Sequence, residues 1–225
     1  YRNLGRVEEA ISYHEQALAI SREIRDRRVE GNHLGNLGLA YGDLERVEEA
    51  ISYHEQALAI SREIKDRRGE GIHLGNLGNA YRNLGRVEEA ISYHEQALTI
   101  SREIGDRLGE GTALGNLGES YIALGKMEEA LNYIQQSLMI AREIGHKTGI
   151  GHQFDNFGCA YEKLKNLPKA LAYWRWAVVI FTEIKSPYVK KSQGHLDELR
   201  AKEGEEAFDR WWAESEAEYQ AIGKV

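Results

Sequence analysis

The sequence has a single cysteine, Cys159, and only two prolines in 225 residues. A lone cysteine excludes an intramolecular disulfide, and a free thiol is typical of a reducing compartment, so we expect a cytoplasmic location. No apolar run approaches the roughly 18 residues that a membrane-spanning helix needs, and no stretch has the pattern of a secretory signal. The net charge of −7 lacks the basic excess of nucleic-acid-binding surfaces. We therefore expect neither a membrane nor a nucleic acid as partner.

Repetition is the dominant feature of the sequence. The stretch VEEAISYHEQALAISREI occurs at 7–24 and 47–64, and it returns at 87–104 with only Thr99 changed. Such self-similarity is the signature of a solenoid, in which each unit buries its apolar face against the next. Two residue types recur every 40 residues along the whole array: Tyr1, Tyr41, Tyr81, Tyr121 and Tyr161, and Ala10, Ala50, Ala90, Ala130 and Ala170.

Each unit contains two helical patterns. In one copy, apolar and small residues recur at helical spacing over about 74–84 and again over 87–104. Gly85 and Arg86 allow only a tight reversal between them, so the two helices should be antiparallel neighbours. Gly105 is suited to a left-handed cap, and Asp106 can cap the next helix. No segment alternates with a period of two residues, which predicts an all-α fold.

The stretch GNLGNAYRNLG, residues 75–85, has the glycine density of a phosphate-binding loop. Such a loop needs its glycines on a turn between a strand and a helix, whereas Gly75 and Gly78 lie inside a predicted helix. Glycine there costs about 0.5–1 kcal/mol. We predict that it instead permits the close approach of a neighbouring helix. The recurring positions are Gly38, Gly78, Gly118 and Gly158.

The segment NLGNAYRNLGRVEEAISYHEQAL closely resembles the tetratricopeptide repeat. The usual repeat has 34 residues, whereas this one has 40, a form similar to the repeats of kinesin light chains, of spindle-orientation adaptors and of bacterial signalling NTPases. The resemblance covers about residues 1–184. It implies a right-handed superhelical solenoid of antiparallel helix hairpins that binds proteins or peptides. The residues that carry it are Leu77, Gly78, Tyr81, Gly85, Ala90, Tyr93, Ala97 and Leu98.

These patterns predict three regions. Residues 1–30 form a partial first repeat, the end of a first helix plus a second helix; 31–185 form four units of 40-residue period; and 186–225 form a C-terminal capping helix pair. We expect the pair to begin at Ser186-Pro187 and to continue with one helix after Gly204. Five aromatics are expected to pack as one cluster, with a partner-binding patch as the alternative: Trp174, Trp176, Phe208, Trp211 and Trp212.

Comparison of the copies with one another places most of their differences on one face of the first helix. In tetratricopeptide arrays the first helices line the concave surface, so the resemblance implies that this face is a peptide-binding groove. It also implies a role for an asparagine that does not vary, because related arrays use asparagines at the matching place to hold extended peptides; bonding to a neighbouring helix is the alternative. The predicted groove residues are Asn36, Asn76, Asn116, Asn156, Leu39, Asn79, Glu119, Arg82, Asn83, Ile122, Glu162, Lys163, Asn32, Ile72, Thr112 and His152.

The charges on this face predict what it would bind. Glycine stands at 35, 75 and 115, where chaperone-binding relatives place a lysine, so we expect no clamp for a terminal carboxylate. The mixed, mildly acidic face favours a peptide with basic or polar character. The charged residues are Arg2, Arg82 and Lys163, set against Asp43, Glu119, Asp155 and Glu162.

No motif for catalysis, metal or cofactor emerges. His14, His54 and His94 recur one repeat apart, roughly 10 Å, which is too far for one ion and indicates packing. The paired glutamates of VEEA suit a helix start. We interpret Cys159 as an ordinary small residue. We therefore expect a non-enzymatic module without cofactor or metal that binds a protein or peptide, as the sensor or adaptor arm of a larger protein, with a bacterial signalling NTPase or an effector as the parent that the resemblance suggests. A structural scaffold that self-associates by repeat stacking is the alternative.

Overall fold

The computed structural model describes the backbone of residues 4–223, so Tyr1 and Arg2 lie outside the described residues. Within this range every regular element is an α-helix, as the sequence predicts. The helices are α1 (Leu4–Glu23), α2 (Arg27–Asp43), α3 (Val47–Glu63), α4 (Arg67–Asn83), α5 (Val87–Glu103), α6 (Arg107–Ala123), α7 (Met127–Glu143), α8 (Lys147–Lys163), α9 (Leu167–Glu183), α10 (Val189–Glu203), α11 (Glu205–Glu214) and α12 (Glu216–Gly223).

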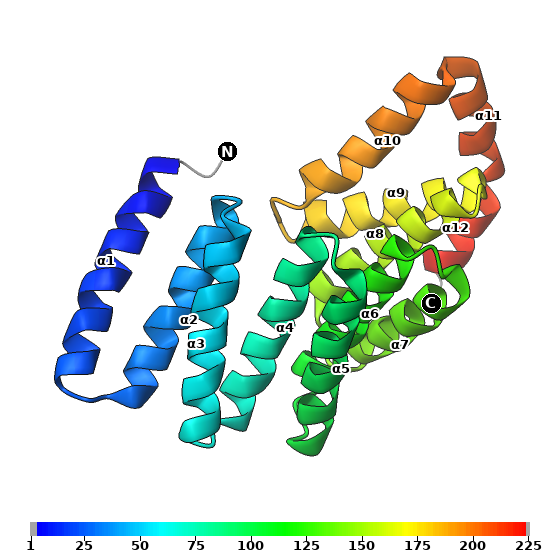
Figure 1. Cartoon of the computed structure of the whole chain (residues 1–225). Coiled ribbons are helices and arrows are strands. Elements are labelled where there is room, and N and C mark those ends of the chain that lie inside the picture. The colour runs from blue at the N-terminus through cyan, green and yellow to red at the C-terminus, as the bar shows by residue number, and fades with distance from the viewer. Residues whose placement is uncertain (1–3, 224–225) are drawn as a thin grey trace. The chain divides into compact units, whose positions relative to one another are not determined.

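The chain divides into two compact units, residues 1–116 and 117–225. In the first unit, helices α1 to α5 each pack on the next in the chain, as successive antiparallel hairpins (Figure 1). In the second unit, α7 packs on α8 and α8 on α9, while α10, α11 and α12 all pack on α9. Helices α1 to α5 and α7 to α10 thus pack on their neighbours in the sequence, as expected of a repeat protein, whereas α11 and α12 return to α9.

Each turn between consecutive helices from α1 to α11 uses one residue in the left-handed region. Gly85 and Gly105 have φ values of 77° and 69°, as predicted for Gly105, while Glu45 and Lys65 adopt 60° and 58° at equivalent positions. Glycine carries no penalty in this region, whereas a side chain costs about 1 kcal/mol. The hairpin geometry therefore overrides the local preference at the turns that lack glycine.

An aspartate caps the start of the first helix in three successive repeats. Its carboxylate oxygen accepts a hydrogen bond from the backbone N–H three residues later, which confirms the role predicted for Asp106. The bonds are Val29 N to Asp26 at 3.0 Å, Gly69 N to Asp66 at 2.9 Å and Gly109 N to Asp106 at 2.9 Å.

The repeated glycines bring the two helices of a hairpin together. A Cβ atom on Gly78 in α4 would lie 2.4 Å from Cε1 of His94 in α5, and one on Gly38 would lie 2.6 Å from the same atom of His54. The prediction of close packing is confirmed, and so is the packing role of these histidines. In the later copies the equivalent glycines face larger apolar side chains, Gly118 against Ile134 and Gly158 against Trp174.

The C-terminal segment differs from the predicted helix pair. Helix α10 begins at Val189 rather than at Ser186, whose Oγ instead accepts a hydrogen bond from Tyr188 N at 3.3 Å. The helix expected after Gly204 is interrupted at Ser215, so that α11 and α12 are separate. Ser215 is fully buried, and its Oγ donates to Trp212 O at 2.7 Å and accepts from Arg175 at 2.8 Å. This side-chain bonding competes with the helical pattern.

The aromatic residues of this segment form two clusters rather than the predicted one. Trp174 and Phe208 are buried together, with Trp211 packed against them. Trp176 belongs to the cluster around α8 and α9, where its ring nitrogen donates to Tyr219 O at 2.7 Å. Trp212 is 37% exposed. The prediction of a single cluster is wrong because Trp174 and Trp176 are two residues apart on α9, so their side chains point to different sides of the helix.

Candidate functional site

Two open cavities lie on the predicted variable face of the first unit. The first lies between α2 and α4, has a volume of about 400 Å³, and has the end of α3 as its floor. Its walls include the side chains of Asn32, Asn36 and Leu39 from α2 and of Ile72 and Asn76 from α4. All five are among the predicted groove residues.

The second cavity is equivalent to the first and lies one 40-residue repeat later in the chain. It lies between α4 and α6, has a volume of about 240 Å³, and has the end of α5 as its floor. The predicted groove residues in its walls are Ile72, Asn76, Asn79, Thr112 and Asn116.

Ile72 and Asn76 line both cavities and therefore form a shared wall. Ile72 is 54% exposed and Leu39 is 51% exposed, so both cavities offer apolar surface beside amide groups. Asn79 contributes a buried carbonyl oxygen that has no hydrogen-bond partner among the described residues. Apolar walls with a few placed polar groups are the usual chemistry of a binding site.

The repeated asparagines are not equivalent in their surroundings. Asn36 is exposed, and Asn76 and Asn116 are half-buried at the cavity walls. Asn156 is buried, and its amide nitrogen donates to Glu119 at 3.2 Å and to Gln153 at 3.4 Å. The last asparagine therefore bonds to a neighbouring first helix, which is the alternative that the sequence left open.

The remaining predicted groove residues are not brought together with those of the cavities. Arg82, Asn83, Glu162 and Lys163 lie in the last turns of α4 and α8 and line neither cavity. In the second unit, His152 contacts the rings of Phe181 and Tyr188, and Ile122 packs on the core around α8.

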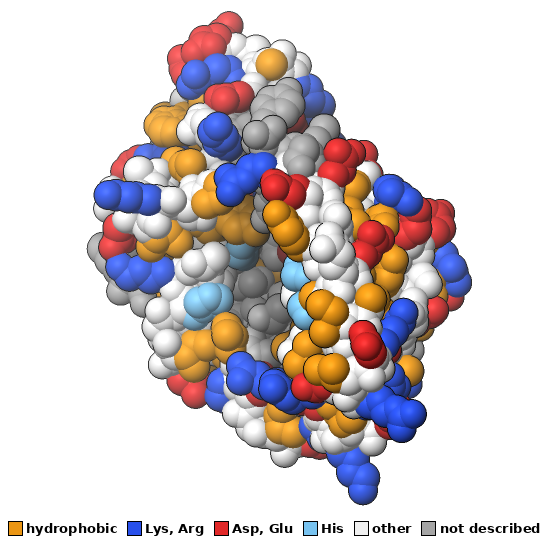
Figure 2. All heavy atoms as spheres, turned by 90° about the vertical axis from the view of Figure 1, so that its left-hand side faces the viewer, with side chains coloured by type: hydrophobic (Ala, Val, Ile, Leu, Met, Phe, Trp, Pro, Cys, Tyr) orange, Lys and Arg blue, Asp and Glu red, His pale blue; other side chains and the backbone are white. Residues whose placement is uncertain are grey.

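The charge around the cavities is mixed. Arg28, Arg68, Asp66 and Asp106 stand at their rims, and Arg68 lies 3.7 Å from Asp106. On the face shown in Figure 2, acidic and basic side chains are interspersed with hydrophobic ones. The rims therefore carry charges of both signs.

The glycines of the walls differ in the space around them. A Cβ on Gly35 would lie 2.6 Å from the ring of His73, whereas one on Gly75 would meet nothing within 4 Å. Gly75 thus faces the open space of the second cavity, which a side chain at this position would fill.

Two histidines of the second helices lie beside histidines of the first helices. Nδ1 of His14 lies 3.2 Å from Nδ1 of His33, and the rings of His54 and His73 are 6.2 Å apart. Burial lowers the pKa of His54 to about 4, and the nearby His73 adds to this. Burial also lowers the pKa of His94 to about 3, with Arg82 contributing. Both imidazoles are therefore neutral at neutral pH and serve as packing groups.

One cluster of chemically active side chains was missed by the sequence reasoning. Cys159, interpreted as an ordinary small residue, lies 3.9 Å from His195, which also lies 3.6 Å from Asp155. Asp155 and Cys159 are four residues apart, but His195 follows the end of the 40-residue period, where copies can no longer be compared. The four-residue spacing was the only available signal.

Comparison with known proteins identifies the family. The tetratricopeptide repeat model matches residues 1–63, 70–143 and 110–183, and the chain belongs to this family. A comparison with curated protein sequences gives no match. Within residues 4–223 no helix is both long and apolar enough to cross a membrane.

Several solved structures share the fold. BtubC (BKLC) from P. vanneervenii is 20% identical with a TM-score of 0.67, covering 92% of this chain and 91% of that one. A Rap protein complexed with competence and sporulation factor is 16% identical with a TM-score of 0.71, covering 95% and 66%. A signal transduction ATPase with a tetratricopeptide repeat sensor from Pyrococcus horikoshii is 19% identical with a TM-score of 0.64, covering 96% and 41%.

Proposed function

We propose that the chain is a protein-interaction module that binds an extended peptide segment across the two cavities of the first unit. The observation that carries the proposal is the shared wall formed by Ile72 and Asn76, which makes the cavities consecutive compartments of one surface. The asparagine amides would bond to the ligand backbone, and Leu39 and Ile72 would contact its apolar side chains.

The spacing of the repeats suits an extended ligand. Packed helices lie roughly 8–10 Å apart, and an extended chain rises about 3.3 Å per residue. About three ligand residues therefore separate equivalent contacts, such as those of Asn36 and Asn76. The mixed charge at the rims favours a peptide with polar or basic residues between its apolar anchors.

Relatives support this kind of role. The Rap protein named above was solved in complex with competence and sporulation factor, and the Pyrococcus protein has a tetratricopeptide repeat sensor. By analogy, we propose that this chain is the sensor or adaptor arm of a larger protein in the cytoplasm and has no catalytic activity of its own.

The test is a peptide selection on the whole chain, followed by affinity measurement on variants. Gly75→Leu would place a side chain in the second cavity, where a Cβ meets nothing within 4 Å, and we expect at least about a tenfold loss of peptide affinity. Gly194→Leu is the matched control, because that glycine also lies inside a helix with nothing within 4 Å of a Cβ. Unchanged affinity in Gly75→Leu would refute the groove assignment.

The asparagines are tested in the same assay. Asn76→Ala removes the amide that serves both cavities and should weaken binding, whereas Asn132→Ala, an exposed asparagine on α7, should not. Light scattering across a concentration range tests the alternative of a self-associating scaffold. A concentration-dependent mass together with no selected peptide would favour that alternative.

A further inference from the structure

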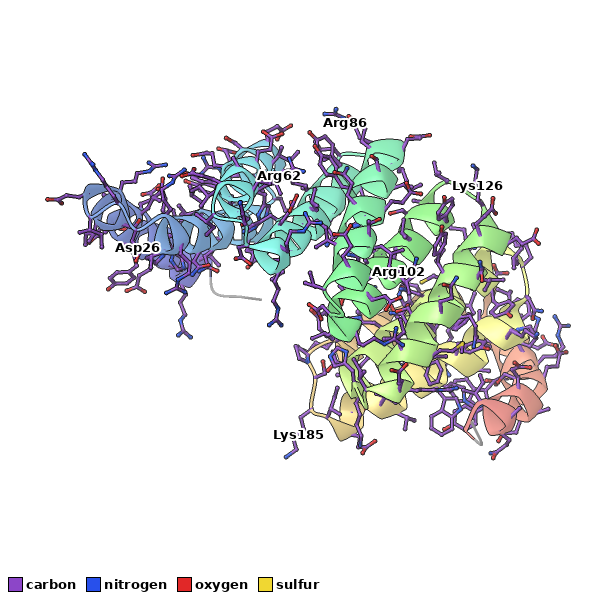
Figure 3. All side chains as sticks on the ribbon, turned by 90° about the horizontal axis from the view of Figure 1, so that it is seen from below. Asp26, Arg62, Arg86, Arg102, Lys126 and Lys185 are labelled. Carbon is purple, nitrogen blue, oxygen red and sulfur yellow. The ribbon has the colours of Figure 1, made fainter. Side chains whose placement is uncertain are left out.

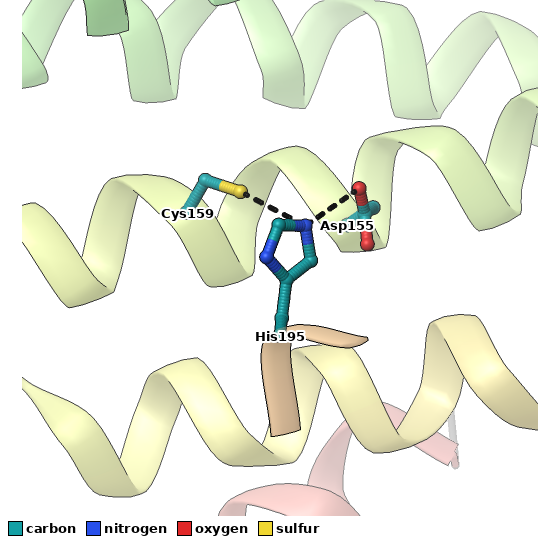
Figure 4. Close-up of side chains that lie close together, drawn as sticks. All are labelled: Asp155, Cys159 and His195. Carbon is teal, nitrogen blue, oxygen red and sulfur yellow. Dashed lines mark hydrogen bonds and ion pairs between the residues drawn. The ribbon is translucent and has the colours of Figure 1, made fainter. Parts of the chain in front are cut away.

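The missed cluster joins α8 to α10. Asp155 and Cys159 lie one helical turn apart on the same face of α8, and His195 reaches them from α10 (Figure 4). The three ligand-type atoms, a thiol sulfur, an imidazole nitrogen and a carboxylate oxygen, all lie within 4.8 Å of one another. Among the residues that the structure describes, this is the one group of three such side chains that converge in this way.

The geometry is not that of a nucleophile with a general base. In a thiol–imidazole–carboxylate relay the carboxylate and the nucleophile contact opposite ring nitrogens, so that one side orients the base that the other uses. Here Cys159 Sγ and Asp155 Oδ2 both approach Nε2 of His195, at 3.9 and 3.6 Å. Three donor atoms around one central point are instead the arrangement of a metal-ligand set.

We propose that Asp155, Cys159 and His195 bind one divalent metal ion of the zinc class. Zinc bonds of about 2.3 Å to sulfur and about 2.0–2.2 Å to nitrogen and oxygen place tetrahedral ligands roughly 3.3–3.6 Å apart. Two of the three separations, 3.6 and 3.9 Å, exceed this by only a few tenths of an ångström, and the third is at most 4.8 Å. A thiolate and an imidazole select a transition metal over magnesium or calcium. Water would take the fourth position.

Neighbouring groups hold the ligands in place. Ser192 Oγ donates to Asp155 Oδ1 at 2.7 Å, which leaves Oδ2 directed at the cluster. The ring of His195 stacks on buried Trp174, with centroids 5.0 Å apart and planes 14° apart. Such outer contacts orient metal ligands, and removing one typically lowers the affinity for the metal by about 10- to 100-fold.

Lys191 provides the sharpest test. Its Nζ lies 2.9 Å from Asp155 Oδ2, so without metal the ammonium group supplies the positive charge that the buried carboxylate needs. The side chain is 56% exposed and can turn to solvent when a metal takes its place. Lysine is thus a competitor and not a ligand, and Lys191→Ala should tighten metal binding.

The experiment titrates the whole purified chain with Zn²⁺ against a chromophoric chelator, and with Co²⁺ followed by absorption. We expect one equivalent bound, a thiolate-to-cobalt charge-transfer band, and a zinc-dependent rise of the melting temperature. Cys159→Ser and His195→Ala should each weaken binding by more than about tenfold, and Cys159→Ser should abolish the band. His33→Ala, in the other unit, is the control and should bind as the parent does.

The competing arrangement is a metal-free ion network that docks α10 on α8. It predicts no stoichiometric binding, and no difference between Cys159→Ser and the parent. Either result overturns the proposal. Urea unfolding of each variant without metal shows whether a loss of metal binding is caused by a loss of folding. If His195→Ala unfolds, Cys159→Ser, the most conservative change, still decides the test. The result of the metal titration is independent of whether the first unit binds a peptide.

Discussion

The backbone of Gly78 lies against the ring of His94, so close that a methyl group on its Cα would be 2.4 Å from Cε1. Gly78→Ala should therefore force the two helices apart and lower the free energy of unfolding by about 1–3 kcal/mol. Gly75→Ala, three residues earlier in the same helix, has free space and should raise it by about 0.5–1 kcal/mol. Urea denaturation of both variants measures the difference. Equal effects would show that the contact does not limit the approach of the helices.

The same histidines make stability depend on pH. Burial depresses the pKa of His94 to about 3 and that of His54 to about 4, against about 6.5 in the unfolded chain. Below pH 6.5 the unfolded state binds protons that the folded state excludes, so the stability present above pH 6.5 is lost as the pH falls, down to about 4 for His54 and about 3 for His94. The slope is about 1.4 kcal/mol per pH unit for each histidine.

A variant taken from the chain itself isolates this effect. His94→Ile reproduces Ile134, the residue that faces Gly118 at the equivalent position. Between pH 7 and pH 5 the parent should lose about 2 kcal/mol more than His94→Ile. Urea midpoints at the two pH values give the comparison, and parallel losses would disprove the role of His94.

A repeated ion cluster joins α1 to α2, α3 to α4 and α5 to α6. Glu30 is 5% exposed and binds both Arg22, at 2.9 Å, and Arg27. Glu30→Gln should cost about 1–2 kcal/mol, because charge-assisted bonds are lost at a buried site while the arginines can turn to water. Glu49 pairs with Arg46 at the surface and is 43% exposed, so Glu49→Gln should cost clearly less.

Calorimetry of Glu30→Gln and Glu49→Gln shows which substitution lowers the stability more. A surface pair of the same type occurs at the α4–α5 turn, where Arg86, labelled in Figure 3, binds Glu89. Its removal should resemble that of Glu49. A larger loss at either surface pair than at Glu30 would contradict the assignment.

The C-terminal helices should act as a cap. Phe208 of α11 is 1% exposed and covers Leu199 and Trp174 in the second unit. Deleting residues 205–225 should uncover this apolar surface and cause association, seen by light scattering, together with a lower melting temperature. Trp212→Ala, at a side chain that is 37% exposed, is the milder control. A truncated chain that stays monomeric with unchanged melting would rule out the cap.

The sequence predicts most of the fold because the copies constrain one another. The period places Gly78 opposite the next helix, and the turns follow from Gly85 and Gly105. Prediction fails where the period ends. The break at Ser215 depends on Arg175, a partner 40 residues away on another helix, and no local pattern carries it.

The candidate sites show the same limit. The variable positions of α2 and α4 do line the cavities, since a helical face is fixed by residue spacing alone. The burial of Asn156 depends on Glu119, and the cluster at Cys159 depends on His195, both more than 35 residues away. Periodicity gives the direction of a side chain but not the residue that it meets.

Equivalent contacts along the first unit also make its 40-residue repeats interchangeable. Removal of residues 47–86 would join α2 to α5 and replace the pair of Gly38 and His54 by Gly38 and His94, with the same chemistry. We expect this shortened chain to fold, as measured by its helix content in circular dichroism. It should recognise a ligand about three residues shorter. Loss of helix would contradict this. The length of the proposed groove would thus change by whole repeats without any residue being redesigned.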